Sequence, residues 1–354
     1  MRIFFRALTL GILLPAPLAS QAASAPCTSP TPTCEQWVAI GGGPARGMVY
    51  SSFRLDRPNP AVTRAFILVH GTRRNADHYF ETATAAAFVA GALGNTVVIS
   101  PYFAADTDKV EPNEVLWPNR GDSWRSGGLS VSHPALSAFD FMDAIVRRLA
   151  EKKNFPNLTK IVVAGHSAGG QFVNRYEMAN KVHGTLAGMS MSYVVANPST
   201  YAWPVALRPL PVGNADSTTA NKEALGPNGT KVNAEFTYGP FDISKLPTYN
   251  NWPAGLQSRT GYTALMSDSQ LTKQLAERPT TYLFGQVDVL PLGGFDSSPT
   301  AMAQGPTRRA RGEAFVKFIT DSLGAKPKVM IVDECGHNDR CVFTTNEVFP
   351  VIFP

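Results

Sequence analysis

The segment Gly165-His166-Ser167-Ala168-Gly169 is the strongest sign of chemistry in this sequence. It follows directly on the apolar run 161–164, and a helical pattern begins at Ser167. A G-x-S-x-G segment between a strand and a helix makes a sharp turn that exposes the serine hydroxyl. The start of the helix also directs backbone N–H groups toward developing negative charge. The sequence therefore predicts that Ser167 is a nucleophile.

A nucleophilic serine needs a base, and His337 is the best placed of the six histidines. It follows the last predicted strand, 328–332, in a loop that can reach over the carboxyl edge of a parallel sheet. His70 and His166 lie in tight turns and are interpreted as supports for those turns. The remaining three lie in or beside predicted helices, where a surface or core role is the default: His78, His133 and His183.

The third member of such a group is a carboxylate that orients the histidine, and Asp288 is predicted to supply it. Asp288 follows the predicted strand 280–284 after a short turn. Asp296 lies deeper in the same Gly/Pro-rich loop and is the first alternative. Asp333 and Glu334 share a loop with His337, which would direct them along that loop rather than beneath the imidazole ring.

Acyl transfer also needs N–H donors for the oxyanion. The residue after the nucleophile, Ala168, and a residue after the early strand 65–69, Thr72, occupy the expected places. The alternative is that the run 70–75 is only a turn that begins a helix. The two interpretations are compatible, because the start of a helix supplies free N–H groups.

The elements that must position these residues alternate along the chain. Apolar runs predict buried strands, and apolar periodicity predicts helices between them. The predicted strands are 48–55, 65–69, 96–100, 161–164, 186–195, 280–284 and 328–332, and the predicted helices are 76–93, 134–153, 167–181, 268–276 and 308–323. This alternation predicts an α/β fold with a doubly wound, mostly parallel sheet and a ligand site at the carboxyl ends of its strands.

Two long irregular segments, 102–133 and 198–259, are predicted to form cap-like loops over the site and to select the substrate. They contain most of the large aromatic residues near the presumed cleft. Of these we expect Trp124 and Trp252 to contact substrate. The alternative is that such large rings fill the core or hold the loops in place.

The first 22 residues are interpreted as a signal peptide, which leaves 23–354 as a single domain. Arg2 and Arg6 provide a positive start, and the apolar stretch 7–18 is too short to span a bilayer. The predicted location is therefore secreted or periplasmic, without a stable membrane anchor. Cleavage is expected near Ala22 or Ala23.

Export favours disulfides, and the four cysteines form two closely spaced pairs. We expect a bridge between Cys27 and Cys34 and another between Cys335 and Cys341, although the sequence leaves a link between the termini open. A metal site made of Cys335, His337 and Cys341 is the alternative, but the pairs lack the CxxC spacing of structural zinc sites.

Composition narrows the class of partner. The 354 residues, 44% of them hydrophobic and 17% charged, indicate a globular protein. The net charge of +5 is spread thinly, without a run of five or six basic residues, which argues against nucleic acid as a partner. No oligomeric state is predicted.

The order Ser167, Asp288, His337, each after a successive buried strand, resembles the α/β-hydrolase superfamily from about Met48 to the C-terminus. The chain is broadly similar to secreted carboxylesterases and to polyester or feruloyl-ester depolymerases. It departs from the lipases that carry an HGGG oxyanion motif, because Gly71-Thr72-Arg73 stands there instead.

The residues and the resemblance together predict a secreted serine hydrolase. It would cleave small-molecule or polymeric carboxylic esters through an acyl-enzyme, with no metal and no organic cofactor. Two alternatives stay open at this point. One is an amidase or peptidase that uses the same three residues, and the other is a non-catalytic binding protein on a hydrolase scaffold.

Overall fold

The predicted strands correspond to all but one strand of an eight-stranded sheet in the computed structural model, which describes residues 25–121, 123–211, 236–292 and 294–354. The predicted signal peptide, residues 1–22, lies outside these described residues. In spatial order the strands are β1 (Glu35–Ala39), β2 (Arg46–Ser51), β4 (Thr96–Pro101), β3 (Arg64–Val69), β5 (Lys160–His166), β6 (Ser190–Ala196), β9 (Thr280–Gly285) and β10 (Lys328–Val332). From β4 to β10 all neighbours pair in parallel, whereas β1 and β2 are antiparallel. The predicted doubly wound, mostly parallel sheet is thereby confirmed.

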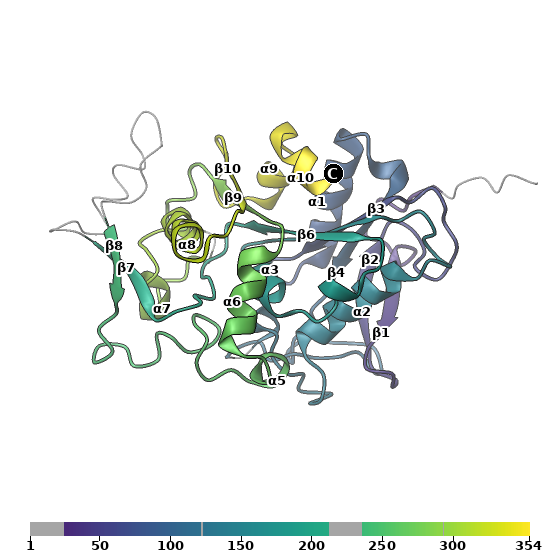
Figure 1. Ribbon diagram of the computed structural model, residues 1–354. Helices are drawn as coiled ribbons and strands as arrows, with labels where there is room; N and C mark the ends of the chain where they lie inside the picture. Colours follow the sequence, from purple (N-terminus) through teal and green to yellow (C-terminus); the bar gives the residue numbers. More distant parts are fainter. Residues whose placement is uncertain (1–24, 122, 212–235, 293) are drawn as a thin grey trace, which may run out of the picture.

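Helices cover both faces of this sheet (Figure 1). One face carries α1 (Ala76–Val89), α9 (Asp339–Phe343) and α10 (Phe349–Ile352), and the other carries α2 (Ala138–Ala150), α3 (Ala168–Ala179), α6 (Asp268–Glu277) and α8 (Arg308–Leu323). Each face has its own cluster of buried apolar side chains. Short helices complete the connections: α5 (Gly261–Ala264), α7 (Pro299–Met302), η1 (Leu93–Asn95), η2 (Trp124–Ser126), η3 (His183–Thr185) and η4 (Asn346–Val348).

Several element boundaries differ from the sequence-based expectations. The first helix ends at Val89 rather than at 93, because Gly91 adopts a positive φ of 65° and turns the chain. The second begins at Ala138, where Ser137 and Asp140 form a capping box. The segment 198–259, predicted to be irregular, contains an antiparallel pair, β7 (Leu207–Pro211) with β8 (Phe236–Pro240).

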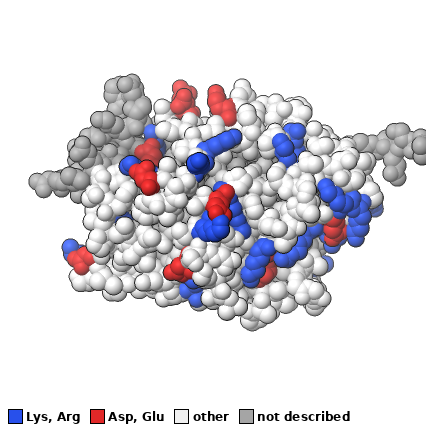
Figure 2. Space-filling model, in the orientation of Figure 1, with Lys and Arg blue, Asp and Glu red and all other residues white. Residues whose placement is uncertain are grey.

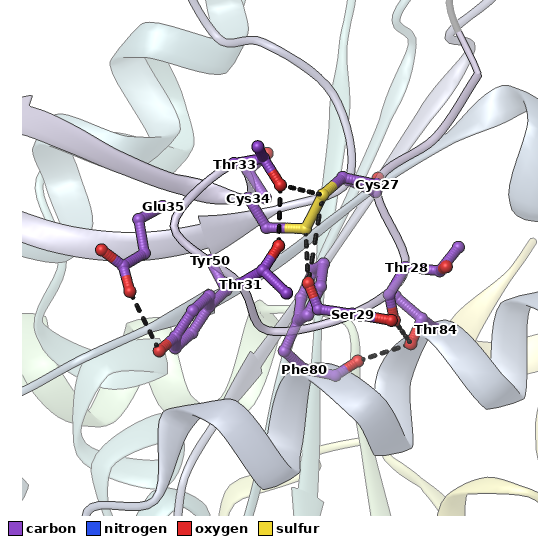
Figure 3. The surroundings of a disulfide bond; sticks show 12 residues. Cys27, Thr28, Ser29, Thr31, Thr33, Cys34, Glu35, Tyr50, Phe80 and Thr84 are labelled. Carbon is purple, nitrogen blue, oxygen red and sulfur yellow. Dashed lines mark hydrogen bonds between the residues drawn. A yellow bond between two sulfur atoms is a disulfide. The ribbon is translucent and has the colours of Figure 1, made fainter.

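The bridge between Cys27 and Cys34 fixes the N-terminal segment to the sheet (Figure 3). The backbone N–H of Cys27 donates to Ser52 O at 2.7 Å, and the N–H of Ser51 donates to Cys34 O at 2.9 Å. Tyr50 stacks on Phe80 of α1 with ring centroids 5.7 Å apart. The disulfide thus lies where the segment before β1 meets both β2 and α1.

Charged side chains do not gather on the face shown in Figure 2. Basic side chains occur in several separate groups with acidic ones among them. In the part of the chain that the structure describes, no helix is both long enough and apolar enough to cross a bilayer.

Candidate active site

The turn between β5 and α3 presents Ser167 in a strained conformation. Its φ of 59° and ψ of −118° are unusual for a residue with a side chain. The turn can be this tight because glycines flank it. A Cβ on Gly165 would lie 2.2 Å from Gly169 O, and one on Gly169 would lie 2.1 Å from Val69 O. Glycine at both positions therefore lets α3 start directly against the ends of β3 and β5.

The structure brings Ser167, His337 and Asp288 together, although they are far apart in sequence. Ser167 Oγ lies 2.9 Å from His337 Nε2, and His337 Nδ1 lies 2.8 Å from Asp288 Oδ2. Asp288 is 2% exposed, whereas Ser167 at 9% borders a cavity. With Nδ1 protonated, His337 donates to the carboxylate and Nε2 accepts from the hydroxyl. The arrangement gives the hydroxyl proton a direct path to a nitrogen base.

The loops that carry Asp288 and His337 are hydrogen-bonded to each other. Val287 N–H donates to Cys335 O at 3.0 Å, and Glu334 N–H donates to Gln286 Oε1 at 2.9 Å. Asn197, after β6, accepts from Gly285 N–H at 2.8 Å. The loops of the acid and the histidine are thus joined by hydrogen bonds from backbone N–H groups to backbone and side-chain oxygens.

The second disulfide, between Cys335 and Cys341, spans His337. The Cα atoms of the two cysteines are 5.7 Å apart, and Cys335 is buried. Asn338 Oδ1 accepts from Cys341 N–H at 2.9 Å within the same loop. The bridge therefore closes a short ring that carries the imidazole.

We predict that replacing Cys335 and Cys341 by serine lowers turnover by about 100-fold, the cost of misplacing a reacting group by about 1 Å. A ring this short contributes roughly 2 to 3 kcal/mol to stability at most, so the fold should persist. Turnover and circular dichroism of the same sample check this. The matched double variant Cys27→Ser with Cys34→Ser should lose stability but keep turnover. Equal loss of activity in both variants would contradict the proposal.

Asp288 also has a second partner, Arg308 at the start of α8. Arg308 Nη1 lies 3.3 Å from Asp288 Oδ1, and both side chains are at most 1% exposed. The same guanidinium donates to Leu292 O at 2.9 Å and, through Nε, to Ser199 Oγ at 3.3 Å. Arg308 is not among the site residues that the sequence predicts. Three arginines in the first turn of a helix oppose its dipole, and this is the signal that could have found it.

His166 packs against His337, with ring centroids 4.6 Å apart. Burial, with smaller effects from His337 and Arg308, holds the pKa of His166 well below the usual range, so its ring is neutral at pH 7. Its nitrogens face Tyr79 Oη at 3.3 Å and Asn197 Nδ2 at 3.4 Å. His70 is likewise buried, and its Nε2 accepts from Phe103 N–H at 3.1 Å. His70 Nδ1 also lies 3.0 Å from Gly71 O in its own turn, whereas His166 contacts α1 and the segment after β6 and forms one wall of the site.

A cavity of about 430 Å³ opens beside Ser167. Thr72 lies in its wall, and Ala168 is the first residue of α3, so its N–H has no partner within the helix. The lining residues come from the turn before α1, from α1, from the Ser167 turn and from the loops after β9 and β10: Gly71, Thr72, Arg73, Asn75, His78, Tyr79, His166, Ser167, Gly294, His337, Asn338 and Asp339.

Trp124 and Trp252 are not among these lining residues. Trp124 is 3% exposed and stacks on Phe103 at 5.1 Å, so it belongs to the core. Trp252 is half-buried, and its Nε1 donates to Ser126 O at 2.9 Å, which ties the segment 198–259 to 102–133. These segments meet at a second cavity of about 250 Å³, one helical turn beyond Ser167 at Gln171. Both indoles have partners within the protein, and their contact with substrate stays a prediction.

Among the described residues, no group of three or more His, Cys, Asp or Glu is arranged to hold a metal ion. Cys335 and Cys341 are bonded to each other, so neither offers a thiolate beside His337.

The chain is similar to known proteins in sequence and in fold. The sequence profile described as the alpha/beta hydrolase family matches residues 66–349. Poly(aspartic acid) hydrolase-1 from Sphingomonas sp. KT-1 superposes with a TM-score of 0.56 at 19% identity, covering 87% of this chain and 95% of that one. LpqC, a poly(3-hydroxybutyrate) depolymerase from Bordetella parapertussis, superposes with a TM-score of 0.56 at 17% identity, covering 89% of both chains. At these identities the structures establish the shared fold. No curated protein matches the chain.

Proposed function

The chain belongs to the alpha/beta hydrolase family, and from this premise we propose that it is a secreted serine hydrolase that cleaves carboxylic esters through an acyl-enzyme. The observation that carries the proposal is the unbroken path from Ser167 Oγ to His337 Nε2 at 2.9 Å and from His337 Nδ1 to Asp288 Oδ2 at 2.8 Å. Similarity in fold to a polyester depolymerase supports esters as the substrate class.

In the first half of the proposed reaction, Ser167 Oγ attacks the ester carbonyl carbon while His337 Nε2 takes the hydroxyl proton. The N–H groups of Thr72 and Ala168 stabilise the oxyanion. The tetrahedral intermediate then collapses, the bond to the alcohol oxygen breaks, and His337 returns its proton to that oxygen. The products are a free alcohol and an acyl-Ser167 ester.

In the second half, a water molecule attacks the acyl-enzyme and His337 Nε2 takes a proton from it. Collapse releases the carboxylic acid, and His337 returns the proton to Ser167 Oγ. The Asp288 carboxylate accepts the Nδ1–H bond of His337 and stabilises the imidazolium that forms twice in each cycle.

The test of this function combines a fluorophosphonate probe with a substrate panel. The probe should modify Ser167, located by mass spectrometry of the peptide that carries it, and the protein should cleave short esters faster than matched amides. Faster amide cleavage would instead identify an amidase that uses the same residues. Absence of both labelling and turnover would support a non-catalytic binding protein.

A further inference from the structure

The cavity beside Ser167 has an unusual lining for an enzyme that acts on fatty esters. Every lining residue that the structure describes is polar or glycine, apart from the aromatic ring of Tyr79. An alkyl chain in this cavity would displace water from amide, guanidinium and imidazole groups without burying itself against apolar side chains. The lining therefore disfavours long acyl or alkyl groups.

The turn that precedes α1 adds hydrogen-bond donors to this cavity. The side chains of Thr72 and Arg73 are exposed at the cavity wall and that of Asn75 is half-buried, and within the described parts of the chain none of the three bonds to another residue. The neighbouring Arg74, by contrast, is paired with Asp108 at 2.6 Å. The donors of Arg73 are thus available to whatever occupies the cavity.

The opposite wall contributes little further acceptor capacity. Asp339 already accepts from Thr82 Oγ1 at 2.8 Å and lies 3.1 Å from His78 Nε2. Its carboxylate therefore already has two partners within the protein. The unused hydrogen-bonding capacity of the cavity is mainly that of donors.

We propose that this cavity binds a short, oxygen-rich part of the ester substrate, one whose chain carries carbonyl, ether or carboxylate oxygens near the scissile bond. The inference rests on the proposed function and specifies its substrate class. An alternative place for an alkyl chain exists outside the cavity, since Val287, Leu290 and Leu292 are exposed on the loop that carries Asp288. The test can therefore show that the protein cleaves esters with alkyl chains faster than esters with oxygen-containing chains.

The experiment compares aryl esters of one leaving group whose acyl chains have equal length but contain either methylenes or ether oxygens. A second series makes the same exchange in the alcohol arm of acetate esters. Each kcat/KM is divided by the rate of hydroxide hydrolysis, which removes inductive effects. We expect the ether chain to be favoured by about fivefold or more in one arm, the size of one hydrogen bond. Arg73→Leu should remove most of this preference, whereas the control Arg57→Leu, an exposed arginine outside the cavity, should keep it.

Two outcomes would overturn this inference while leaving the proposed function intact. One is equal or better cleavage of alkyl chains in both arms, and the other is an unchanged preference in Arg73→Leu. Failure to cleave any ester, together with no modification of Ser167 by the fluorophosphonate probe, would overturn the proposed function instead.

A second inference stands on a separate observation, the buried pair between Arg308 and Asp288. His337 binds one carboxylate oxygen of Asp288 and Arg308 binds the other. We propose that Arg308 is a positioning residue, which fixes the rotation of the Asp288 carboxylate and tempers its attraction for the imidazolium of His337. This too rests on the proposed function.

The positive charge of Arg308 also acts electrostatically on a histidine of the site. It helps to lower the pKa of His166, whose ring packs against His337. The other charged or titratable groups near His337 come from its own loop, from the cavity walls and from the loop after β9: Asp333, Glu334, Asp339, Arg340, His78, Tyr79, Arg73 and Asp288. Arg308 differs from these groups because it is the cation that pairs with Asp288, the carboxylate that holds the imidazole.

Removing this charge should make the imidazolium form of His337 easier to populate. In Arg308→Gln we expect the acid limb of the kcat/KM profile to move up by about one pH unit. Arg308→Lys retains the charge and should return the acid limb toward its position in the wild-type protein. If Arg308→Gln does not fold, the profile of Arg308→Lys is compared with that of the wild-type protein instead. The control is Arg309→Gln, which removes an equally buried arginine that bonds Glu313 and Gln286 instead.

A purely structural role predicts lower stability in both glutamine variants without a change in the pH profile. An unmoved acid limb in folded Arg308→Gln, or an equal shift in Arg309→Gln, would overturn the positioning role. If the wild-type protein shows no turnover of any ester, that result would contradict the proposed function and would not bear on Arg308.

Discussion

Replacing Ser167 with alanine is expected to lower kcat by about 10⁵-fold or more while the protein stays folded. The loss is this large because, in the proposed mechanism, the hydroxyl forms the covalent bond to the acyl group. Alanine keeps the Cβ in the tight turn, so the strained φ of 59° is no worse than in the native protein. Steady-state turnover and a thermal melt of the same preparation measure the two quantities.

The matched control is Ser100→Ala in β4. Ser100 is as buried as the core, and its hydroxyl donates to Leu68 O at 3.2 Å. This variant should lose about 1 kcal/mol of stability and keep its turnover. Turnover within tenfold of wild type in Ser167→Ala would remove Ser167 from the mechanism.

The second large effect is expected at the acid. Asp288→Asn should lower kcat by about 10⁴-fold, because an amide cannot both hold the Nδ1–H tautomer and stabilise the imidazolium. It also leaves the buried guanidinium of Arg308 without its carboxylate, so some stability should be lost. Turnover is therefore measured well below the melting temperature of the variant.

Asp296→Asn provides the comparison from the same loop. Asp296 Oδ1 accepts from Ser298 N–H at 2.9 Å, a local contact that an asparagine oxygen can also make. Turnover should remain within a few-fold of wild type. If Asp296→Asn proves the more damaging change, the acid has been assigned to the wrong position.

The parallel core of the fold could be predicted from the sequence because each of its strands is a short apolar run. The segments 65–69, 96–100, 161–164, 280–284 and 328–332 all lie within strands of the sheet. Since parallel strands end at one edge, the residues that follow β5, β9 and β10 had to lie near one another. This is why the sequence could predict that Ser167, Asp288 and His337 lie close together.

Strands with less regular patterns escaped prediction. In β1 the core-facing positions are Gln36 and Val38, so no apolar alternation is visible. Gln36 is buried because its amide serves the backbone, donating to Phe53 O and accepting from Leu55 N–H. Strands β7 and β8 are separated by residues 212–235, so the sequence has no short hairpin turn from which their pairing could be predicted.

The arginines of α8 show a different limit of sequence reasoning. Charged residues at the start of an amphipathic helix are ordinarily placed in solvent. Arg308, Arg309 and Arg311 are instead at most 1% exposed, because each also bonds an oxygen from another element: Asp288 Oδ1, Gln286 O and Ser199 O, respectively. Only the assembled fold reveals those partners.

The hydrogen bonds between the loops after β9 and β10 have a consequence for motion. Because Val287 is bonded to Cys335 and Gln286 to Glu334, thermal displacement of one loop carries the other with it. The separation of Asp288 and His337 should accordingly fluctuate less than that of His337 and Ser167, which belongs to the β5–α3 turn. Acid and base then travel as one body relative to the nucleophile, and a graft onto another scaffold would have to transfer both loops together.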